Sequence, residues 1–337
     1  MNSNPANTNY KDWAAQLNRL GAERTPCFFL IDFKASEAKI WKTEELDARH
    51  VQFNFHGRGN DLSLPPPSDT ELIAKAYFPK PEHYRIAFNI VEAGLKRGDS
   101  FLTNLTFPVP VELATDLYKV YAASRAPYRI WWKDNLACFS PETFVRIDEH
   151  GRISSNPMKG TALDQPGAAE KLISNHKEVA EHATIVDLIR NDLSRVATQV
   201  SVARYRYLDR LESPEGALLQ TSSEIVGQLD DDWRSRLGTL LAGLLPAGSI
   251  SGAPKPATLD IIRRAENRSR WYYCGIGGYF DGHKLDSCVL IRLIQQLSPM
   301  AHLFWAGGGI TARSNWEDEY AELCAKVRVP RRSFSEV

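Results

Sequence analysis

Alternation of hydrophobic and polar positions along the 337-residue chain predicts pairs of strands interleaved with long helices. Residues 128–140 form two apolar stretches around a short polar turn, and residues 274–294 form two more around Asp281-Gly282, a pair suited to a tight reversal. Residues 302–310 predict a further strand that ends in three glycines. Because adjacent hairpins favour antiparallel sheets, the pattern predicts an α+β fold rather than a doubly wound parallel one.

The longest predicted helix, residues 167–197, carries acidic residues close to its apolar face. On a helical wheel the apolar stripe consists of Ile185, Ile189, Leu193 and Val196. Glu178, Glu181 and His182 fall on or beside that stripe, although a pair of helical glutamates is ordinarily solvated. Burying an unpaired carboxylate is costly, so we expect a positive charge at this face.

A second predicted helix, residues 316–326, places Glu319 and Glu322 three residues apart, with Lys326 one turn further on. Two such Glu-x-x-Glu pairs from distant segments suggest an all-oxygen site of the kind that Mg²⁺ prefers. A di-iron bundle would need Glu-x-x-His spacing, which is absent here because His182 directly follows Glu181.

Three consecutive prolines within residues 62–69 predict the main boundary in the chain. Residues 1–68 are expected to form a short, strand-rich segment that belongs to the same fold as the rest. Residues 69–331 are expected to form one large domain.

Composition narrows the class of protein. The 41 basic and 41 acidic side chains cancel, which argues against a nucleic-acid partner. No apolar run approaches the roughly 20 residues of a membrane span, and the polar N-terminus does not resemble a signal peptide. The five scattered cysteines include no CxxC pair, so we expect a cytoplasmic protein without a disulfide framework or zinc site.

Several other positions suggest a pocket for a small polyanion. Gly307, Gly308 and Gly309 expose successive backbone amides that suit an anion, with a bulge or tight bend as an equally weighted alternative. Arg292 lies in an apolar run and needs a carboxylate or phosphate partner, which a structural ion pair would also supply. Lys159, in a constrained Pro-Met-Lys-Gly-Thr turn, is either an ordinary solvated side chain or a reagent.

Seven blocks of the sequence resemble the chorismate-utilising enzymes in order and approximate spacing. They are "NPMKGT", "HKEVAEHATIVDLIRNDL", "LLPAGSISGAPK", "GIGGYFDG", "VLIR", "AGGGI" and "SNWEDEYAELCAK". The family includes the large subunits of anthranilate synthase and aminodeoxychorismate synthase, with isochorismate and salicylate synthases. The resemblance implies an anthranilate synthase component I-like fold of two antiparallel β-sheets flanked by helices, Mg²⁺ dependence and chorismate as substrate.

The resemblance also implies roles for individual residues. Glu181 and Glu322 match the Mg²⁺ ligands of the family, and Glu178 and Glu319 match the adjacent supporting acids. Glu142 matches the general acid that protonates the departing hydroxyl, for which its pKa should be raised by burial. The positions that match substrate contacts are Thr161, Tyr273, Arg292, Lys326 and the amides of Gly307, Gly308 and Gly309.

Lys159 distinguishes between members of the family. Anthranilate synthases resemble "PIAGT" at this turn, whereas aminodeoxychorismate synthases resemble "PIKGT", so the chain is similar to component I of the latter. In those relatives the lysine adds to C2 of the ring and expels the C4 hydroxyl. Ammonia then enters at C4 and releases the lysine. The alternatives are an anthranilate synthase with an unusual turn and a non-catalytic subunit of the same fold. Leu102, where isochorismate synthases have a lysine, disfavours hydroxylation.

Amination needs a source of ammonia. None of the five cysteines has glycine on both sides, as the nucleophile of a glutaminase of the relevant type would. We therefore expect a separate glutamine amidotransferase subunit as partner.

Overall fold

The computed structural model describes residues 10–61, 72–211 and 217–330 of the chain. Within these ranges it leaves eight side chains undescribed: those of Tyr10, Lys11, Lys159, Thr161, His176, Lys177, Leu211 and Leu218. The predicted proline-rich boundary at residues 62–69 lies outside the described residues.

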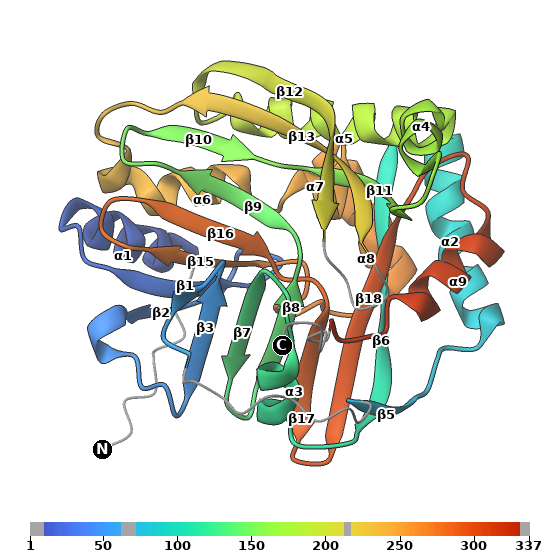
Figure 1. Ribbon diagram of the computed structural model, residues 1–337, viewed down its shortest axis with the longest axis horizontal. Coiled ribbons are helices and arrows are strands. Elements are labelled where there is room, and N and C mark those ends of the chain that lie inside the picture. The colour runs from blue at the N-terminus through green and yellow to red at the C-terminus, as the bar shows by residue number, and fades with distance from the viewer. Residues whose placement is uncertain (1–9, 62–71, 212–216, 331–337) are drawn as a thin grey trace.

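Two nine-stranded sheets form the centre of the described chain (Figure 1). The first runs in the order β11 (Met158–Leu163), β13 (Leu218–Gln228), β10 (Arg152–Ser155), β9 (Thr143–Ile147), β16 (Leu285–Val289), β15 (Ile276–Phe280), β1 (Cys27–Ile31) and β2 (Ala38–Lys42), with β12 (Thr198–Leu211) beside β13. The second runs in the order β14 (Gly252–Ala253), β6 (Leu102–Leu113), β18 (Ala301–Ile310), β17 (Leu293–Ser298), β8 (Leu136–Ser140), β7 (Tyr128–Trp132), β3 (Val51–Phe55) and β4 (Arg58–Gly59), with β5 (Ile73–Ala76) beside β6. Every described strand pair is antiparallel, which confirms the predicted α+β class with two antiparallel sheets.

Helices flank both sheets. They are α1 (Tyr10–Ala22), α2 (Pro81–Lys96), α3 (Leu117–Ala123), α4 (Ala168–Ser174), α5 (His176–Leu193), α6 (Leu237–Leu244), α7 (Gly248–Ser251), α8 (Lys255–Glu266) and α9 (Trp316–Ala325), with short 3₁₀ turns at Thr43–Glu45 and Trp233–Arg236. Helices α2, α3, α8 and α9 pack on the second sheet, and α1, α5 and α6 share a core with the first. None of the described helices is long and apolar enough to cross a membrane.

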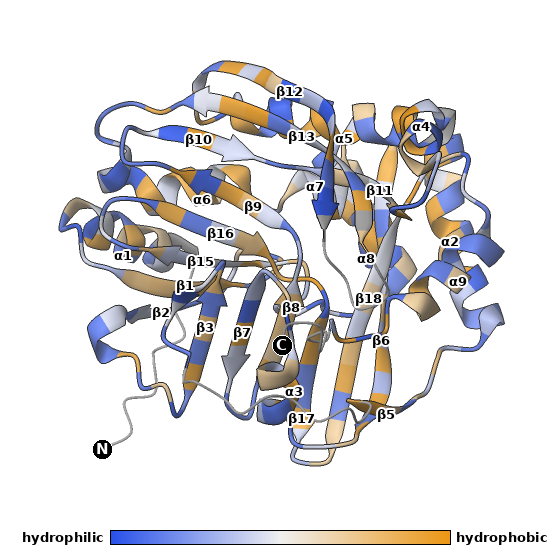
Figure 2. Ribbon diagram, viewed as in Figure 1, coloured by the Kyte–Doolittle hydropathy of each residue, from blue (hydrophilic) through white to orange (hydrophobic). Residues whose placement is uncertain are grey.

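The two sheets meet through aromatic side chains. Hydrophobic and hydrophilic residues alternate along β3 (Figure 2), which directs Phe53 and Phe55 into the core. The ring of Phe53 stacks on that of Phe28 from β1, with centroids 4.4 Å apart and planes 5° apart. Strands from the N-terminal segment thus belong to both sheets, because β1 and β2 extend the first and β3 pairs with β7 in the second.

Two of the connections between the sheets are neighbours, one centred on Glu142 and the other on Arg292, and we call them the paired crossovers. At Glu142 it leaves β8 of the second sheet for β9 of the first, and at Arg292 it leaves β16 of the first for β17 of the second. The amide of Val289 donates to the carbonyl of Glu142 at 3.1 Å, and the amide of Phe139 donates to that of Arg292 at 3.0 Å. These hydrogen bonds hold the crossovers together.

Three predicted elements differ from the observed ones. The predicted helix 167–197 is two helices, because Asn175 adopts an extended backbone and its side chain accepts the amide of Glu178 at 3.2 Å as a new cap. The predicted second strand of the 274–294 hairpin is split at Arg292, whose φ of +54° turns the chain into the other sheet. The Pro-Met-Lys-Gly-Thr turn is part of strand β11, where the register with β13 shifts between Met158 and Thr161.

A buried ion pair links α8 to the second sheet. Arg270 Nη2 lies 2.6 Å from Glu266 Oε1, and both side chains are almost completely buried. The same carboxylate accepts the amide of Thr106 at 2.9 Å, and Arg270 donates to the carbonyl of Asn104 at 2.6 Å. The pair therefore fixes the segment of β6 that lies beside the glycines of β18.

We predict that Glu266→Gln lowers the free energy of unfolding by about 3 kcal/mol or more, because it leaves a buried guanidinium without its charge partner. Urea unfolding followed by circular dichroism measures the loss. The matched control is Glu92→Gln, which breaks an exposed ion pair of the same i,i+4 spacing with Lys96 and should cost about 0.5 kcal/mol or less. Equal losses for the two variants would contradict the prediction.

Candidate active site

The paired crossovers bring Glu142 and Arg292 together from distant parts of the sequence. Arg292 Nη1 donates to the carbonyl of Lys326 at 2.7 Å, so its observed partner is the end of α9 and not a carboxylate. Burial lowers the pKa of this guanidinium, an effect that Tyr273 opposes. Tyr273 itself stacks on Trp305, with ring centroids 5.5 Å apart, and burial raises its pKa well above the ordinary value.

Glu142 is partly buried at its crossover. Burial raises the pKa of its carboxyl group, while a hydrogen bond from Ser249 and the charge of Lys326 act in the opposite direction. The expectation that burial raises this pKa is confirmed. The role of Glu142 as a proton donor stays a prediction.

The glycines of β18 lie against the acidic face of α9. A Cβ atom added to Gly308 would be 3.5 Å from both Glu319 Oε2 and Lys326 Nζ, and 3.7 Å from Glu322 Oε1. Lys326 Nζ lies 2.6 Å from Glu322 Oε1 and donates to the carbonyl of Gly307 at 2.8 Å. Glycine at position 308 thus leaves the space into which these three side chains point.

The glycine segment is a regular strand. Gly307, Gly308 and Gly309 pair with Thr106, Leu105 and Asn104 of β6 without a shift of register, so the alternative of a bulge or tight bend is wrong. On the opposite edge, β17 begins at Leu293 opposite Trp305. Among the described strands none pairs with that edge beyond Trp305, which leaves backbone groups of the glycine segment available to a ligand.

The second acidic pair lies on α5. Glu178 and Glu181 are partly buried, and His182 is fully buried, as the helical wheel predicted. His182 Nε2 lies 2.6 Å from Ser223 Oγ, and burial together with Arg206 lowers its pKa to about 4, so it is neutral at pH 7. Glu178 Oε2 is buried without a hydrogen-bond partner in the described chain.

Strand β11 brings the Lys159 segment to this acidic pair. The register shift between Met158 and Thr161 is a β-bulge, and Gly160 has the φ of +88° that such a position favours. A Cβ atom at Gly160 would lie 3.2 Å from Glu178 Oε2. The side chains of Lys159 and Thr161 are outside the described residues, so their predicted roles stay predictions.

The four candidate metal-binding acids form two pairs, one on α5 and one on α9. The described residues contain no group of three or more His, Cys, Asp or Glu side chains gathered closely enough to hold a metal ion. The four acids nevertheless fit Mg²⁺ chemically, because all are carboxylates and the buried Glu178 Oε2 has no hydrogen-bond partner among the described residues. The metal site therefore stays a prediction.

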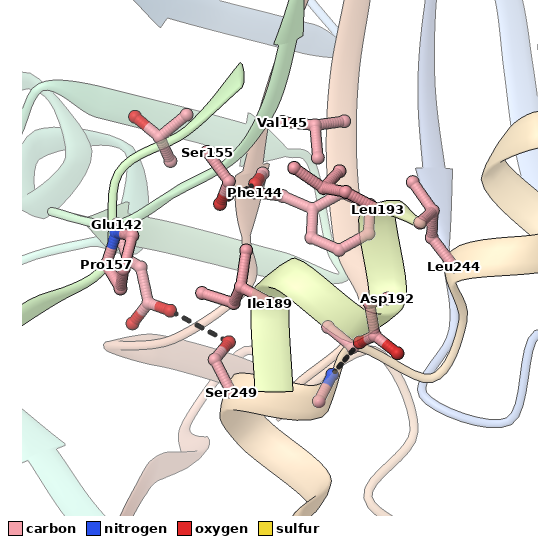
Figure 3. A pocket seen from close by; sticks show the side chains of 13 residues that line it. Glu142, Phe144, Val145, Ser155, Pro157, Ile189, Asp192, Leu193, Leu244 and Ser249 are labelled. Atoms are coloured by element: carbon pink, nitrogen blue, oxygen red, sulfur yellow. Dashed lines mark hydrogen bonds between the residues drawn. The ribbon is translucent and has the colours of Figure 1, made fainter. Parts of the chain in front are cut away.

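Residues that the sequence analysis did not assign surround Glu142. A cavity of about 20 Å³, the volume of about one water molecule, lies between β9, α5 and α7 (Figure 3). Glu142, Asp192 and Ser249 contribute polar groups to its lining. Ser249 lies in the block "LLPAGSISGAPK", for which the sequence analysis assigned no residue role.

The chain is similar to known proteins over most of its length. Residues 23–332 match the chorismate binding enzyme family. A PabA-like protein of Haemophilus influenzae, described as uncharacterised, is 43% identical over 327 residues, which cover 96% of this chain and 98% of that protein. An aminodeoxychorismate synthase component 1 of Salmonella typhimurium is 35% identical over 259 residues, and an anthranilate synthase component 1 of Acetivibrio thermocellus is 33% identical over 315. These alignments cover 72% and 88% of this chain but only 56% and 58% of the two synthases.

Solved structures show the same fold. The isochorismate synthase MenF of Escherichia coli has a TM-score of 0.73 at 18% identity, with 95% of this chain and 81% of MenF covered. Anthranilate synthase component I of Streptococcus pneumoniae has a TM-score of 0.65 at 26% identity, with coverage of 78% and 62%. The fold, the order of the motifs and the match over residues 23–332 lead to one conclusion: the chain belongs to the chorismate binding enzyme family.

Proposed function

We propose that the chain is a component I of aminodeoxychorismate synthase, which converts chorismate and ammonia into 4-amino-4-deoxychorismate, the precursor of 4-aminobenzoate and folate. The observation that carries the proposal is a lysine at position 159, in a bulge whose next residue lies against Glu178. Bulges occur often beside active sites, where they direct a side chain. A lysine at such a position suits a nucleophile better than an ordinary strand residue.

In the proposed reaction Lys159 adds to C2 of the ring as the C4 hydroxyl leaves, and Glu142 donates the proton that converts this hydroxyl into water. Ammonia then bonds to C4 and Lys159 is released. Lys159 must be neutral to attack, so we expect desolvation to depress its pKa. The raised pKa of Glu142 favours the protonated form that a general acid needs.

The remaining residues would bind and orient the substrate. Arg292, Lys326 and the glycine segment face the carboxylate groups of chorismate in this proposal, and Tyr273 and Thr161 line the pocket. Glu181 and Glu322, supported by Glu178 and Glu319, would hold a Mg²⁺ ion that, when bound, neutralises the ring carboxylate.

Ammonia would come from a glutamine amidotransferase partner, because the chain has no cysteine in the setting that glutaminase chemistry needs. Anthranilate synthase component I is the second candidate. The similarity to the Acetivibrio and Streptococcus proteins of that name favours it, whereas Lys159 favours amination at C4.

We predict that the protein with chorismate, ammonium and Mg²⁺ produces 4-amino-4-deoxychorismate, identified by mass spectrometry. Lys159→Ala should lose most of this activity, by about 100-fold or more, because it removes the nucleophile. Glutamine should replace ammonium only when an amidotransferase subunit is added.

The control for this prediction is Lys171→Ala, which removes an exposed lysine on α4 and should retain normal turnover. Anthranilate as the product would transfer the assignment to the second candidate. Unchanged turnover in Lys159→Ala would show that the lysine is not the nucleophile.

We further predict that Glu181→Gln raises the Mg²⁺ concentration needed for half-maximal activity by about tenfold or more, since it removes a charged oxygen ligand. Mg²⁺ titration of activity after treatment with a chelator measures the change. Glu317→Gln, an exposed acid on α9, is the control and should behave as the wild type. Full activity without any divalent ion would contradict the prediction.

A third prediction concerns the glycine segment. Gly308→Val should weaken chorismate binding by about tenfold or more, because its methyl groups displace Glu319 and Lys326 from positions that a Cβ atom already contacts. Gly308→Ala adds only the Cβ atom at ordinary contact distances and serves as the control. Calorimetry measures both affinities, and equal affinity for valine and glycine would contradict the prediction.

A further inference from the structure

A largely buried ion pair holds the turn that follows α6. Asp192, near the end of α5, accepts the amide of Gly248 at 3.0 Å and lies 2.7 Å from Lys255 Nζ. The same lysine donates to the carbonyl of Leu244 at 3.1 Å. One carboxylate of α5 thus fixes the turn from the end of α6 to the start of α8.

The turn is packed closely against this carboxylate. A Cβ atom on Gly248 would lie only 2.7 Å from Asp192 Oδ2, so the backbone approaches as closely as glycine permits. Within α7, Ser251 Oγ donates to the carbonyl of Ala247 at 2.8 Å. The position of the intervening Ser249 is therefore strongly constrained.

Ser249 faces Glu142 across the small cavity (Figure 3). Its Oγ donates to Glu142 Oε1 at 3.1 Å. Ser249 and Glu142 are both partly buried, and the cavity between them has a volume of only about 20 Å³, so solvent access to this hydrogen bond is restricted. The bond therefore engages one of the two oxygens of the proposed general acid in a defined direction.

We propose that Ser249 is a positioning residue that occupies Oε1 of Glu142 and so keeps the transferable proton on Oε2. This inference rests on the proposed function, in which Glu142 protonates the departing C4 oxygen. In that step the Oε2–H bond breaks, its electron pair stays on Glu142, and the proton joins the oxygen, which leaves C4 with the C–O bonding pair as water. The hydrogen bond from Ser249 then stabilises the carboxylate that results.

The other groups near Glu142 determine the sign of the expected pH effect. Lys326, at the end of α9, favours the carboxylate, as does Ser249. The thiols of Cys274 and Cys288 stay protonated, because burial raises the pKa of both, to about 12 for Cys274. Asp192, in the lining of the same cavity, is paired with Lys255. Removing the Ser249 hydroxyl should therefore raise the pKa of Glu142.

The test compares the pH dependence of kcat in the wild type and in Ser249→Ala, with chorismate, ammonium and Mg²⁺. The alkaline limb reports loss of the proton from the general acid. In Ser249→Ala it should move to higher pH by about one pH unit, and maximal kcat should fall about tenfold, as expected for a lost hydrogen bond to a charged group. Ser249→Thr retains a hydroxyl and should restore both.

The matched control is Ser155→Ala. Ser155 lines the same cavity and is buried, but its hydroxyl donates to the carbonyl of Phe144 and not to Glu142. It should leave the alkaline limb in place. An unchanged limb in Ser249→Ala, or an equal displacement in Ser155→Ala, would overturn the inference.

A second measurement needs no turnover and separates this inference from the proposed function. Infrared titration of the Glu142 carboxyl band, assigned with Glu142→Gln, should show a higher pKa in Ser249→Ala than in the wild type. An equal pKa would overturn the inference even in an active enzyme. If the wild type forms no product from chorismate, the proposed function is overturned, whereas the infrared titration still tests the effect of Ser249 on the Glu142 carboxyl group.

Discussion

The hydrogen-bonded pair of crossovers is the constraint on which the candidate site depends. An antiparallel sheet positions residues well along its own strands, but Glu142 and Arg292 lie where the chain changes from one sheet to the other. The carbonyl of Glu142 accepts a hydrogen bond from the amide of Val289, in the strand that leads into the Arg292 crossover. The carbonyl of Arg292 accepts one from the amide of Phe139, in the strand that leads into the Glu142 crossover. Movement of one sheet relative to the other would therefore change the relative positions of Glu142 and Arg292.

Lys326 connects the paired crossovers to helix α9. Its carbonyl accepts a hydrogen bond from Arg292, and its ammonium group contacts Glu322 and the carbonyl of Gly307. Its charge opposes the rise in the pKa of Glu142 that burial causes. A single residue at the end of α9 thus couples a crossover, the glycine strand and two carboxyl groups. Beside the glycine strand, the Arg270–Glu266 pair fixes β6 through the main chain of Asn104 and Thr106. Two ion pairs, Lys326–Glu322 and Arg270–Glu266, thus hold the charged side chains of the candidate site and the strand next to it.

Hydrophobic periodicity predicted the elements whose pairing is local. The hairpins β7–β8 and β15–β16 and the helix that carries Glu319 were found because each needs only neighbouring residues. The break at Asn175 had a local signal that we did not use, an Asn-x-x-Glu capping pattern with Glu178. The change from one sheet to the other at Arg292 had no local signal in the sequence, because an apolar run shows the same pattern whether it belongs to one sheet or is divided between two. The Ser249–Glu142 contact joins residues 107 apart and depends on the whole fold.

The bulge in β11 has a consequence for how this family changes. Between Met158 and Thr161 the ladder with β13 is interrupted, so the intervening backbone contributes little to the cohesion of the sheet. A replacement at position 159 is therefore expected to leave the architecture intact, and under the proposed function it would change the reaction of the bound ligand. New activities are expected to arise at this residue by single steps, since natural selection can test them there at little cost to folding.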